Sequence, residues 1–371
     1  MKILILNLLI FIVTLFPFDL VFSKTIAHII STKGEFVTID LSGNKKIKEG
    51  KLAGITSIEN ISPGDVVNDE VNNLLFVVNN SHDILKIFVY DLKTLKQLKI
   101  LEVVSDYGED ENAVKVFVAP KRSAFYVKWW DSALNNRNGG QILSIYYSKT
   151  LGKIKDYRGI LLTEKILVSN DGLKIYSISD QESAARVDVF NSETFEKIQT
   201  INLEDIITRG VFGRGVDDFK NNKLLLIENY KKNKSDQGSY GFYTFDINLK
   251  KASNIIQTKL EGTAFLLPDG NKVAFNEEKD ISSTSLGEII SLGKIHIYDF
   301  DVAKQVGEVT LGNAPIGRIL GSSTNGKKLV YYSSQHNGSN SKITIIDLSN
   351  YSILTQIPAP KGSAFMTLYV E

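Results

Sequence analysis

One short pattern recurs seven times along the 371-residue chain: an alternating apolar strand that usually ends in an acidic or small polar residue and is followed by a tight turn. The last residues of these strands are Asp40, Asp91, Tyr147, Asn191, Asp246, Asp299 and Asp347. Neighbouring copies are separated by between 44 residues (Tyr147 to Asn191) and 56 residues (Asp91 to Tyr147). This period is close to that of a β-propeller blade, which takes roughly 40 to 50 residues with its loops. Four strands cannot bury their apolar faces alone, so the repeat predicts blades packed face to face in a ring.

A second apolar run precedes six of these strands and is itself preceded by a turn. The turns are SPGD at Ser62, APKR at Ala119, SNDG at Ser169, FKNN at Phe219, LPDG at Leu267 and STNG at Ser323. Asp-Gly and Asn-Gly supply the positive φ that a tight hairpin turn requires. Each unit is therefore expected to contain β-hairpins.

The first unit and the end of the chain complete one another. A strand over Ile26–Ser31 precedes the strand that ends at Asp40, but there is no room for an innermost strand before it. The chain ends in an apolar run from Ser363 to Val370 that has no partner in its own repeat. Pairing this run with the N-terminal three strands would close the ring and leave no long exposed edge. We therefore predict an all-β, seven-bladed β-propeller of four-stranded antiparallel blades, closed one strand plus three.

The last repeat, NAPIGRILGSSTNGKKLVYYSS, carries Pro315, Gly317, Gly326, Leu329 and Tyr331. It resembles the YVTN-type seven-bladed propeller repeat, which combines a Pro-x-Gly step, an SPDG-like turn and a strand that ends in small polar residues. Propellers of this kind include lactonases and the propeller subunit of quinone-dependent amine dehydrogenases. The shared motifs are structural, so the resemblance implies a blade and not an activity.

The N-terminus predicts export. Residues 1–23 have a basic Lys2, an apolar run from Ile3 to Phe16 and small residues before a cleavage site after Ser23, which is typical of a signal peptide. An uncleaved anchor is the alternative, but a run of about 14 residues is short of the roughly 20 that span a bilayer. Residues 24–371 contain no linker-like tract and are expected to form a single propeller domain with no membrane span after cleavage.

Composition excludes several kinds of chemistry. The chain has no cysteine, which excludes disulfides, thiolate metal sites, a thiol nucleophile and covalently attached haem. The formal net charge of +1 gives no reason to expect nucleic acid as a partner. No motif indicates a cofactor or a metal site, so neither is expected.

Predicted loop lengths differ between the two faces of the ring. Loops on one face are uniformly tight, whereas those on the other extend over residues 31–35, 130–141, 229–241 and 276–294. Folding alone favours short connections, so the long-loop face is the predicted binding surface.

Aromatic and acidic candidates come first on this face. Trp129 and Trp130 close a strand; one of them is expected to pack between blades, and the other could form a platform for a sugar or a partner side chain. Arg137 lies in the loop that follows. Asp106 and Tyr107 belong to SDYGEDEN, whose carboxylates could hold Ca²⁺ but lack EF-hand spacing, which favours a solvated loop.

Basic residues and histidines complete the set of candidates. Arg209 and Arg214 lie in the glycine-rich stretch TRGVFGRGVDD, where guanidiniums and backbone amides could hold an anion. His82 and His336 fall in equivalent loops of different blades and are too few for a structural zinc site. Arg318, with Asp106, His82 and Arg209, could converge at the channel mouth in an enzyme. The repeated Asp residues are better explained as acceptors for turn amides.

Two functions remain open. No Ser-His-Asp arrangement or Gly-x-Ser-x-Gly motif is present. The sequence therefore favours an exported, periplasmic or secreted, non-catalytic propeller that binds a protein or an envelope or extracellular polymer, with a monomer as the simplest assembly. The alternative is an exported enzyme or enzyme subunit, lactonase-like or amine-dehydrogenase-like, with a site at the channel mouth.

Overall fold

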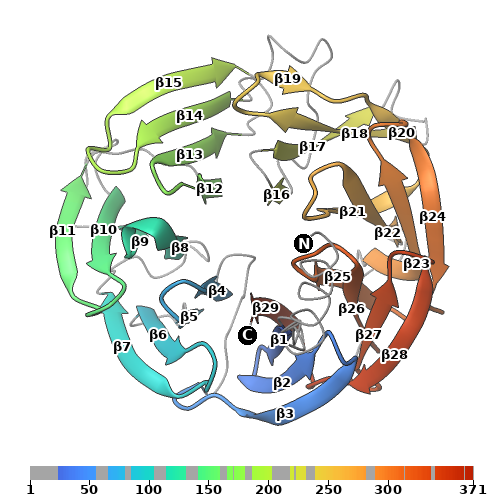
Figure 1. The fold of residues 1–371 in the computed structure, drawn as a ribbon, viewed down its shortest axis with the longest axis horizontal. Coiled ribbons are helices and arrows are strands. Elements are labelled where there is room, and N and C mark those ends of the chain that lie inside the picture. Colours follow the sequence, from blue (N-terminus) through green and yellow to red (C-terminus); the bar gives the residue numbers. More distant parts are fainter. Residues whose placement is uncertain are drawn as a thin grey trace, which may run out of the picture.

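A computed structural model describes residues 24–55, 66–79, 85–103, 114–130, 141–158, 165–169, 171–179, 186–202, 218–220, 223–230, 239–280, 289–312, 314–335, 339–362 and 364–370. These residues form seven antiparallel sheets arranged as blades around a common axis (Figure 1). The seven-bladed all-β propeller predicted from the repeat is confirmed.

Each blade is given with its strands from the centre outward. Blade 1 contains β29 (Ala364–Val370), β1 (Thr25–Ser31), β2 (Glu35–Asp40) and β3 (Lys45–Lys51). Blade 2 contains β4 (Val66–Asp69), β5 (Leu74–Asn79), β6 (Leu85–Asp91) and β7 (Gln97–Val103). Blade 3 contains β8 (Lys115–Ala119), β9 (Ala124–Trp130), β10 (Gln141–Tyr147) and β11 (Lys153–Arg158), with the 3-10 turn η1 (Pro120–Arg122) between β8 and β9.

The remaining blades follow in chain order. Blade 4 contains β12 (Lys165–Val168), β13 (Lys174–Ser179), β14 (Arg186–Asn191) and β15 (Lys197–Asn202). Blade 5 contains β16 (Asp218–Lys220), β17 (Lys223–Tyr230), β18 (Ser239–Asp246) and an outer strand in two pieces, β19 (Lys251–Ala252) and β20 (Ile256–Thr258). Blade 6 contains β21 (Glu261–Leu266), β22 (Lys272–Asp280), β23 (Ile289–Asp299) and β24 (Lys304–Thr310). Blade 7 contains β25 (Ile316–Ser322), β26 (Lys328–Ser334), β27 (Lys342–Asp347) and β28 (Ser352–Pro358).

The ring closes in blade 1, as predicted. β29 pairs antiparallel with β1 along its whole length, from Thr25 opposite Val370 to Ser31 opposite Ala364. Lys328 of blade 7 reinforces the closure, because its ammonium donates hydrogen bonds to the carbonyl of Leu41 and, at 2.8 Å, to Asn44 Oδ1. Blade 1 is therefore completed by a full strand pairing and is held to blade 7 by the contacts of Lys328.

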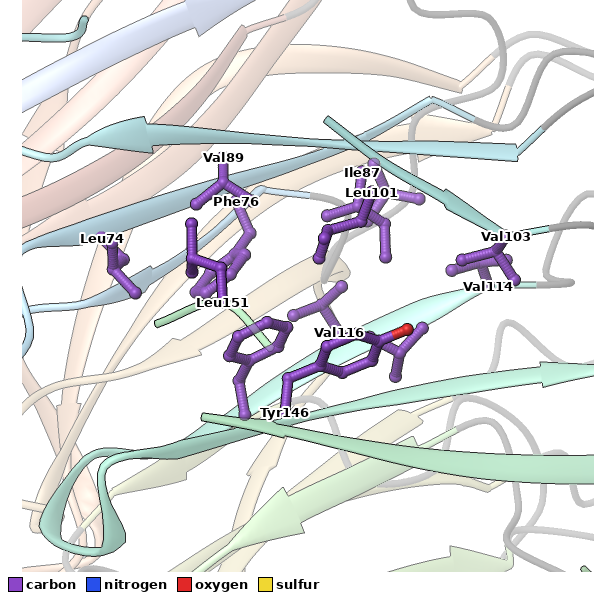
Figure 2. Packing of buried hydrophobic residues seen from close by; sticks show 13 residues of the cluster. Leu74, Phe76, Ile87, Val89, Leu101, Val103, Val114, Val116, Tyr146 and Leu151 are labelled. Atoms are coloured by element: carbon purple, nitrogen blue, oxygen red, sulfur yellow. The ribbon is translucent and has the colours of Figure 1, made fainter. Parts of the chain in front are cut away.

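The core lies between blades because each central strand is apolar on both faces. In β5, Phe76 and Val78 face blade 3, whereas Leu75 and Val77 pack in the cluster shared with blade 1. Figure 2 shows the cluster between blades 2 and 3, where side chains from the two sheets point toward one another. The ring centroids of Phe76 and Phe125 are 4.6 Å apart across this interface. The continuous apolar run LLFVV thus encodes a strand buried on both sides.

The recurring Asp residues hold the turns that follow them. Asp91 Oδ1 accepts hydrogen bonds from the amide and the hydroxyl of Thr94, both at 2.8 Å, and Asp347 Oδ1 accepts the amide of Ser349 at 2.8 Å. Although its partial burial favours the neutral acid, these hydrogen bonds keep the pKa of Asp91 below its ordinary value. The predicted structural role of these residues is confirmed.

The outermost strand of six blades carries a bulge directly after this turn. In blade 1, Ile39 pairs with Lys46 and Thr38 with Lys48, so that Ile47 is the extra residue. The extra residues of the other blades are Leu98, Ile154, Ile198, Val306 and Leu354. Bulges of this kind twist an exposed edge and discourage edge-to-edge pairing.

Candidate functional site

The strand ends confirm that connections on the two faces differ in length. On one face, β6 ends at Asp91 and β7 begins at Gln97, and β27 ends at Asp347 and β28 begins at Ser352. On the other face, β7 ends at Val103 and β8 begins at Lys115, and β15 ends at Asn202 and β16 begins at Asp218. We call the second side the long-loop face.

One predicted loop is largely a hairpin. Residues 276–294 were expected to form a loop, but β22 continues to Asp280 and β23 begins at Ile289, with Glu278 opposite Ser291 and Asp280 opposite Ile289. The sequence NEEKD lacks apolar alternation because Glu277 and Glu278 are only partly buried and Lys279 is exposed. Similarly, β17 extends to Tyr230 and β18 begins at Ser239, so the expected loop over residues 229–241 is also shortened.

A buried polar network joins the blade 6 hairpin to the innermost strands of blades 6 and 7. Asn276, which is fully buried, donates hydrogen bonds to Glu278 Oε1 at 2.9 Å and to the carbonyl of Gly317 at 3.0 Å. Thr263 of β21 donates to the same Glu278 oxygen at 2.9 Å. Because every member is engaged, the network fixes the hairpin relative to both neighbouring strands.

The network continues into blade 7 through Ser291. Its hydroxyl lies 2.7 Å from the hydroxyl of Tyr331, and burial raises the pKa of Tyr331 to about 12. A Cβ on Gly317 would lie 1.9 Å from the Tyr331 hydroxyl oxygen and 2.7 Å from Ser291 Oγ. There is no room for a side chain at position 317, which explains the glycine in the Pro-x-Gly step of this repeat.

The hairpin is also attached to the segment that enters blade 7. The amide of Leu311 donates to the carbonyl of Gly293 at 2.7 Å, and Ser291 forms a β-bridge with Ala314. A Cβ on Gly293 would lie 2.0 Å from the carbonyl oxygen of Gly312, so the two backbones are in close contact. The base of the hairpin is thus a rigid part of the long-loop face.

Arg318 lies on the innermost strand of blade 7. It is the third residue of β25, which starts at the long-loop face, and its guanidinium carbon lies 4.8 Å from the ring centroid of Phe365 on β29. This distance is typical of a cation–π contact. Burial lowers the pKa of Arg318 from its ordinary value.

Trp129 packs between blades. It lies against the cluster shared by blades 2 and 3, and its Nε1–H donates to Ser144 Oγ at 2.9 Å. Ser144 in turn donates to Asp156 Oδ1 at 2.5 Å. Of the two alternatives for this tryptophan, the structure supports packing. The backbone of Trp130 pairs with Gln141, but its side chain lies outside the described residues.

The remaining site residues predicted from the sequence fall outside the part of the chain that the structure describes. They are His82, Asp106, Tyr107, Arg137, Arg209, Arg214 and His336. Within the described ranges, no three His, Asp or Glu side chains come together in a way that could hold a metal ion. The described part of the chain also has no helix that is long and apolar enough to cross a membrane.

Two histidines that the sequence did not favour as functional are buried. His296 lies between two carboxylates, with Nε2 2.9 Å from Glu277 Oε2 and Nδ1 3.4 Å from Glu308 Oε2. His28 Nε2 donates to the carbonyl of Leu92 at 2.7 Å, and its Nδ1 is 2.9 Å from Thr38 Oγ1. Burial is the largest cause that lowers the pKa of His28 to about 4. His28 is therefore a neutral imidazole in the interface between blades 1 and 2.

Comparisons with known proteins agree on the fold. The chain is similar over 93% of its length to 93% of a hypothetical selenium-binding protein from Sulfolobus tokodaii, with a TM-score of 0.57 and 12% identity. It is similar over 84% of its length to 91% of a hydrazine synthase chain from Kuenenia stuttgartiensis (TM-score 0.54, 15% identity). A putative 6-phosphogluconolactonase from Bacteroides fragilis is matched over 94% of this chain and 99% of that chain, with a TM-score of 0.54 and 10% identity.

These similarities define the class of protein as a β-propeller and extend no further. No protein-family model matches the sequence, and no curated protein matches it. Identities this low show a shared fold, and a propeller fold hosts unrelated functions.

Proposed function

We propose that this protein is an exported, non-catalytic propeller of the YVTN-repeat type that binds a protein or an envelope or extracellular polymer through its long-loop face. The observation that carries the proposal is the one-sided distribution of long connections, which folding does not require. Residues 1–23, with their signal-like pattern, support export.

The base of the blade 6 hairpin suits a docking surface. The network of Asn276, Glu278, Ser291 and Tyr331 holds it before any partner arrives. A surface that is already ordered loses less conformational entropy on binding, which strengthens affinity. Lys279 is exposed on this hairpin and offers a charged contact.

A capture experiment tests the proposal. Tagged protein covering residues 24–371 would be recovered from its native source beside a variant in which residues 281–288 are replaced by Asn-Gly. This replacement joins Asp280 to Ile289 by a tight turn and leaves the buried network in place. A control with Val302→Ser and Lys327→Ser alters exposed turn residues on the opposite face.

The proposal predicts a stoichiometric partner that is recovered by the parent protein and by the control but is lost with the hairpin variant. Equal recovery by all three forms would place the partner elsewhere. If all three are recovered alone and native mass spectrometry detects a bound small molecule or metal, the enzyme alternative replaces the binding function. Arg318→Gln would then be the first variant to assay, because Arg318 is the one enzyme-site candidate that lies within the described residues.

A further inference from the structure

The outermost strands of blades 1 and 3 are strongly basic, and in blade 2 between them Lys99 is balanced by Glu102. β3 reads KKIKEGK and is exposed at every residue, and β11 reads KIKDYR and is exposed at all but one. β7 reads QLKILEV and presents Lys99 between exposed Leu98 and Ile100. Figure 1 shows these three strands following one another along the outer circumference of the ring.

Edge protection alone does not account for this distribution. Lysine on an exposed edge strand discourages aggregation, and every blade has such an edge. The outer strands of blades 4, 6 and 7 nevertheless read KIQTIN, KQVGEVT and SILTQIP. They remain protected by bulges with little charge, so the lysines of blades 1 and 3 exceed what protection needs.

Two of these strands carry a basic–aliphatic–basic triplet that is centred on the bulge residue. Lys46-Ile47-Lys48 and Lys153-Ile154-Lys155 each place the bulge residue between two lysines, and Ile47 and Ile154 are 53% and 43% exposed. Lys48 lies 5.5 Å from the centroid of Phe36, and Lys155 lies 4.3 Å from that of Tyr157. The aromatic rings beneath them hold these ammonium groups at defined positions.

Some of the positive charge is locally neutralised. Lys46 pairs with Glu49 at 2.9 Å, and Lys153 pairs with Asp156 at 3.0 Å. Lys48, Lys99 and Lys155 occupy equivalent positions in successive blades. Lys48 and Lys99 donate to the carbonyls of Thr94 and Leu151, which leaves their charge in place, so the arc carries a net positive charge in a chain whose total is only +1.

We propose that this arc is a docking surface for a flexible, linear polymer that carries a phosphate group in each repeat unit. Lysine ammonium groups bind phosphate as point charges. A flat bilayer can touch only one or two blades of a convex rim, whereas a flexible chain can follow three. Single-stranded nucleic acid favours exposed aromatic platforms for its bases, and the exposed apolar residues of this arc are aliphatic.

Fluorescence anisotropy with labelled inorganic polyphosphate tests this surface. The test variant is Lys48→Glu with Lys155→Glu, and the matched control is Lys251→Glu with Lys304→Glu on the outer strands of blades 5 and 6. Both variants change the net charge equally, and thermal melting verifies that each is folded. A milder pair, Lys48→Gln with Lys155→Gln, separates loss of charge from repulsion.

We expect the test variant to bind polyphosphate at least about tenfold more weakly than the control, with a smaller salt dependence of affinity. Long polyphosphate should bind more tightly than tripolyphosphate, because only the long chain reaches from β3 to β11. If the test and control variants lose affinity for polyphosphate equally, net charge alone determines the affinity and the proposal is overturned. Equal affinity for the short and long chains, or tighter binding of anionic lipid vesicles or oligo-dT with the same lysine dependence, would also overturn it. The hairpin variant tests the long-loop face and not the outer circumference, so the two outcomes are independent.

Discussion

The free energy of unfolding should decrease as the pH is lowered from 6.5 to 4, because His28 binds a proton in the unfolded chain but not in the folded protein. The ring of His28 is 1% exposed, and its neighbours are the hydroxyl of Thr38, the carbonyl of Leu92 and the ring of Tyr369. The nearby charged group that acts on its pKa is Lys48, which also disfavours the imidazolium. The folded protein therefore holds His28 neutral at a pH where the unfolded chain binds a proton.

The magnitude follows from the two pKa values. His28 changes from an ordinary 6.5 to about 4 in the folded state. Each unit of difference is worth about 1.4 kcal/mol, so the full effect is about 3 kcal/mol. Because the folded pKa is the lower one, this stability is complete above pH 6.5, declines as the pH falls and is fully lost below about pH 4.

Urea unfolding of the parent protein and of His28→Gln at several pH values between 7 and 4 measures the effect. Glutamine can still donate to the Leu92 carbonyl but does not titrate. The difference in unfolding free energy between the two proteins should change by about 3 kcal/mol across this range. His296→Gln removes a buried imidazole from another blade and serves as the control. If His28→Gln shows the same pH dependence as the parent, the assignment of a neutral, buried His28 is wrong.

Three further substitutions test packing, backbone and closure by chemical denaturation. Gly317→Ala should destabilise the protein by about 1–3 kcal/mol, because the added methyl group would overlap with Tyr331 and Ser291. The loss should be smaller in a Tyr331→Phe background. Gly152→Ala is the control and should cost less, because its methyl group would lie 3.3 Å from the nearest atom, Thr150 Oγ1. Ala303→Gly should stabilise it by about 0.5 kcal/mol, because Ala303 is exposed and has a φ of 50°; a loss of stability would contradict this backbone conformation. Lys328→Met should destabilise it by about 1–2 kcal/mol, since Lys328 donates to Leu41 and Asn44 across the closure. Equal effects of Lys328→Met and of Lys327→Met at the exposed neighbouring position would argue against that role.

The fold was predictable because the information that determines it is local and repeated. Each blade carries its own alternating strands, and six of the seven have a turn that begins with an Asp or Asn acceptor, such as Asp91 and Asn191. The closing strand could be recognised because the run from Ser363 to Val370 had no partner within its repeat.

The candidate site was less predictable because its contacts join distant parts of the chain. Asn276 reaches the carbonyl of Gly317, and Ser291 reaches Tyr331, from different blades. The charged residues around Glu278 gave the pattern of a loop, although their backbone is paired. The basic arc was missed as well, because Lys48, Lys99 and Lys155 are far apart in the sequence and come to equivalent positions only when the blades pack side by side.

The most direct test of the binding function is site-specific photo-crosslinking. A photoreactive amino acid would replace Lys279 on the blade 6 hairpin, and in a second variant Lys93 in the tight turn of the opposite face; both positions are exposed. In the native source, binding through the long-loop face predicts one discrete adduct from position 279 and none from position 93. An adduct from position 93 alone, or identical adducts from both positions, would contradict it.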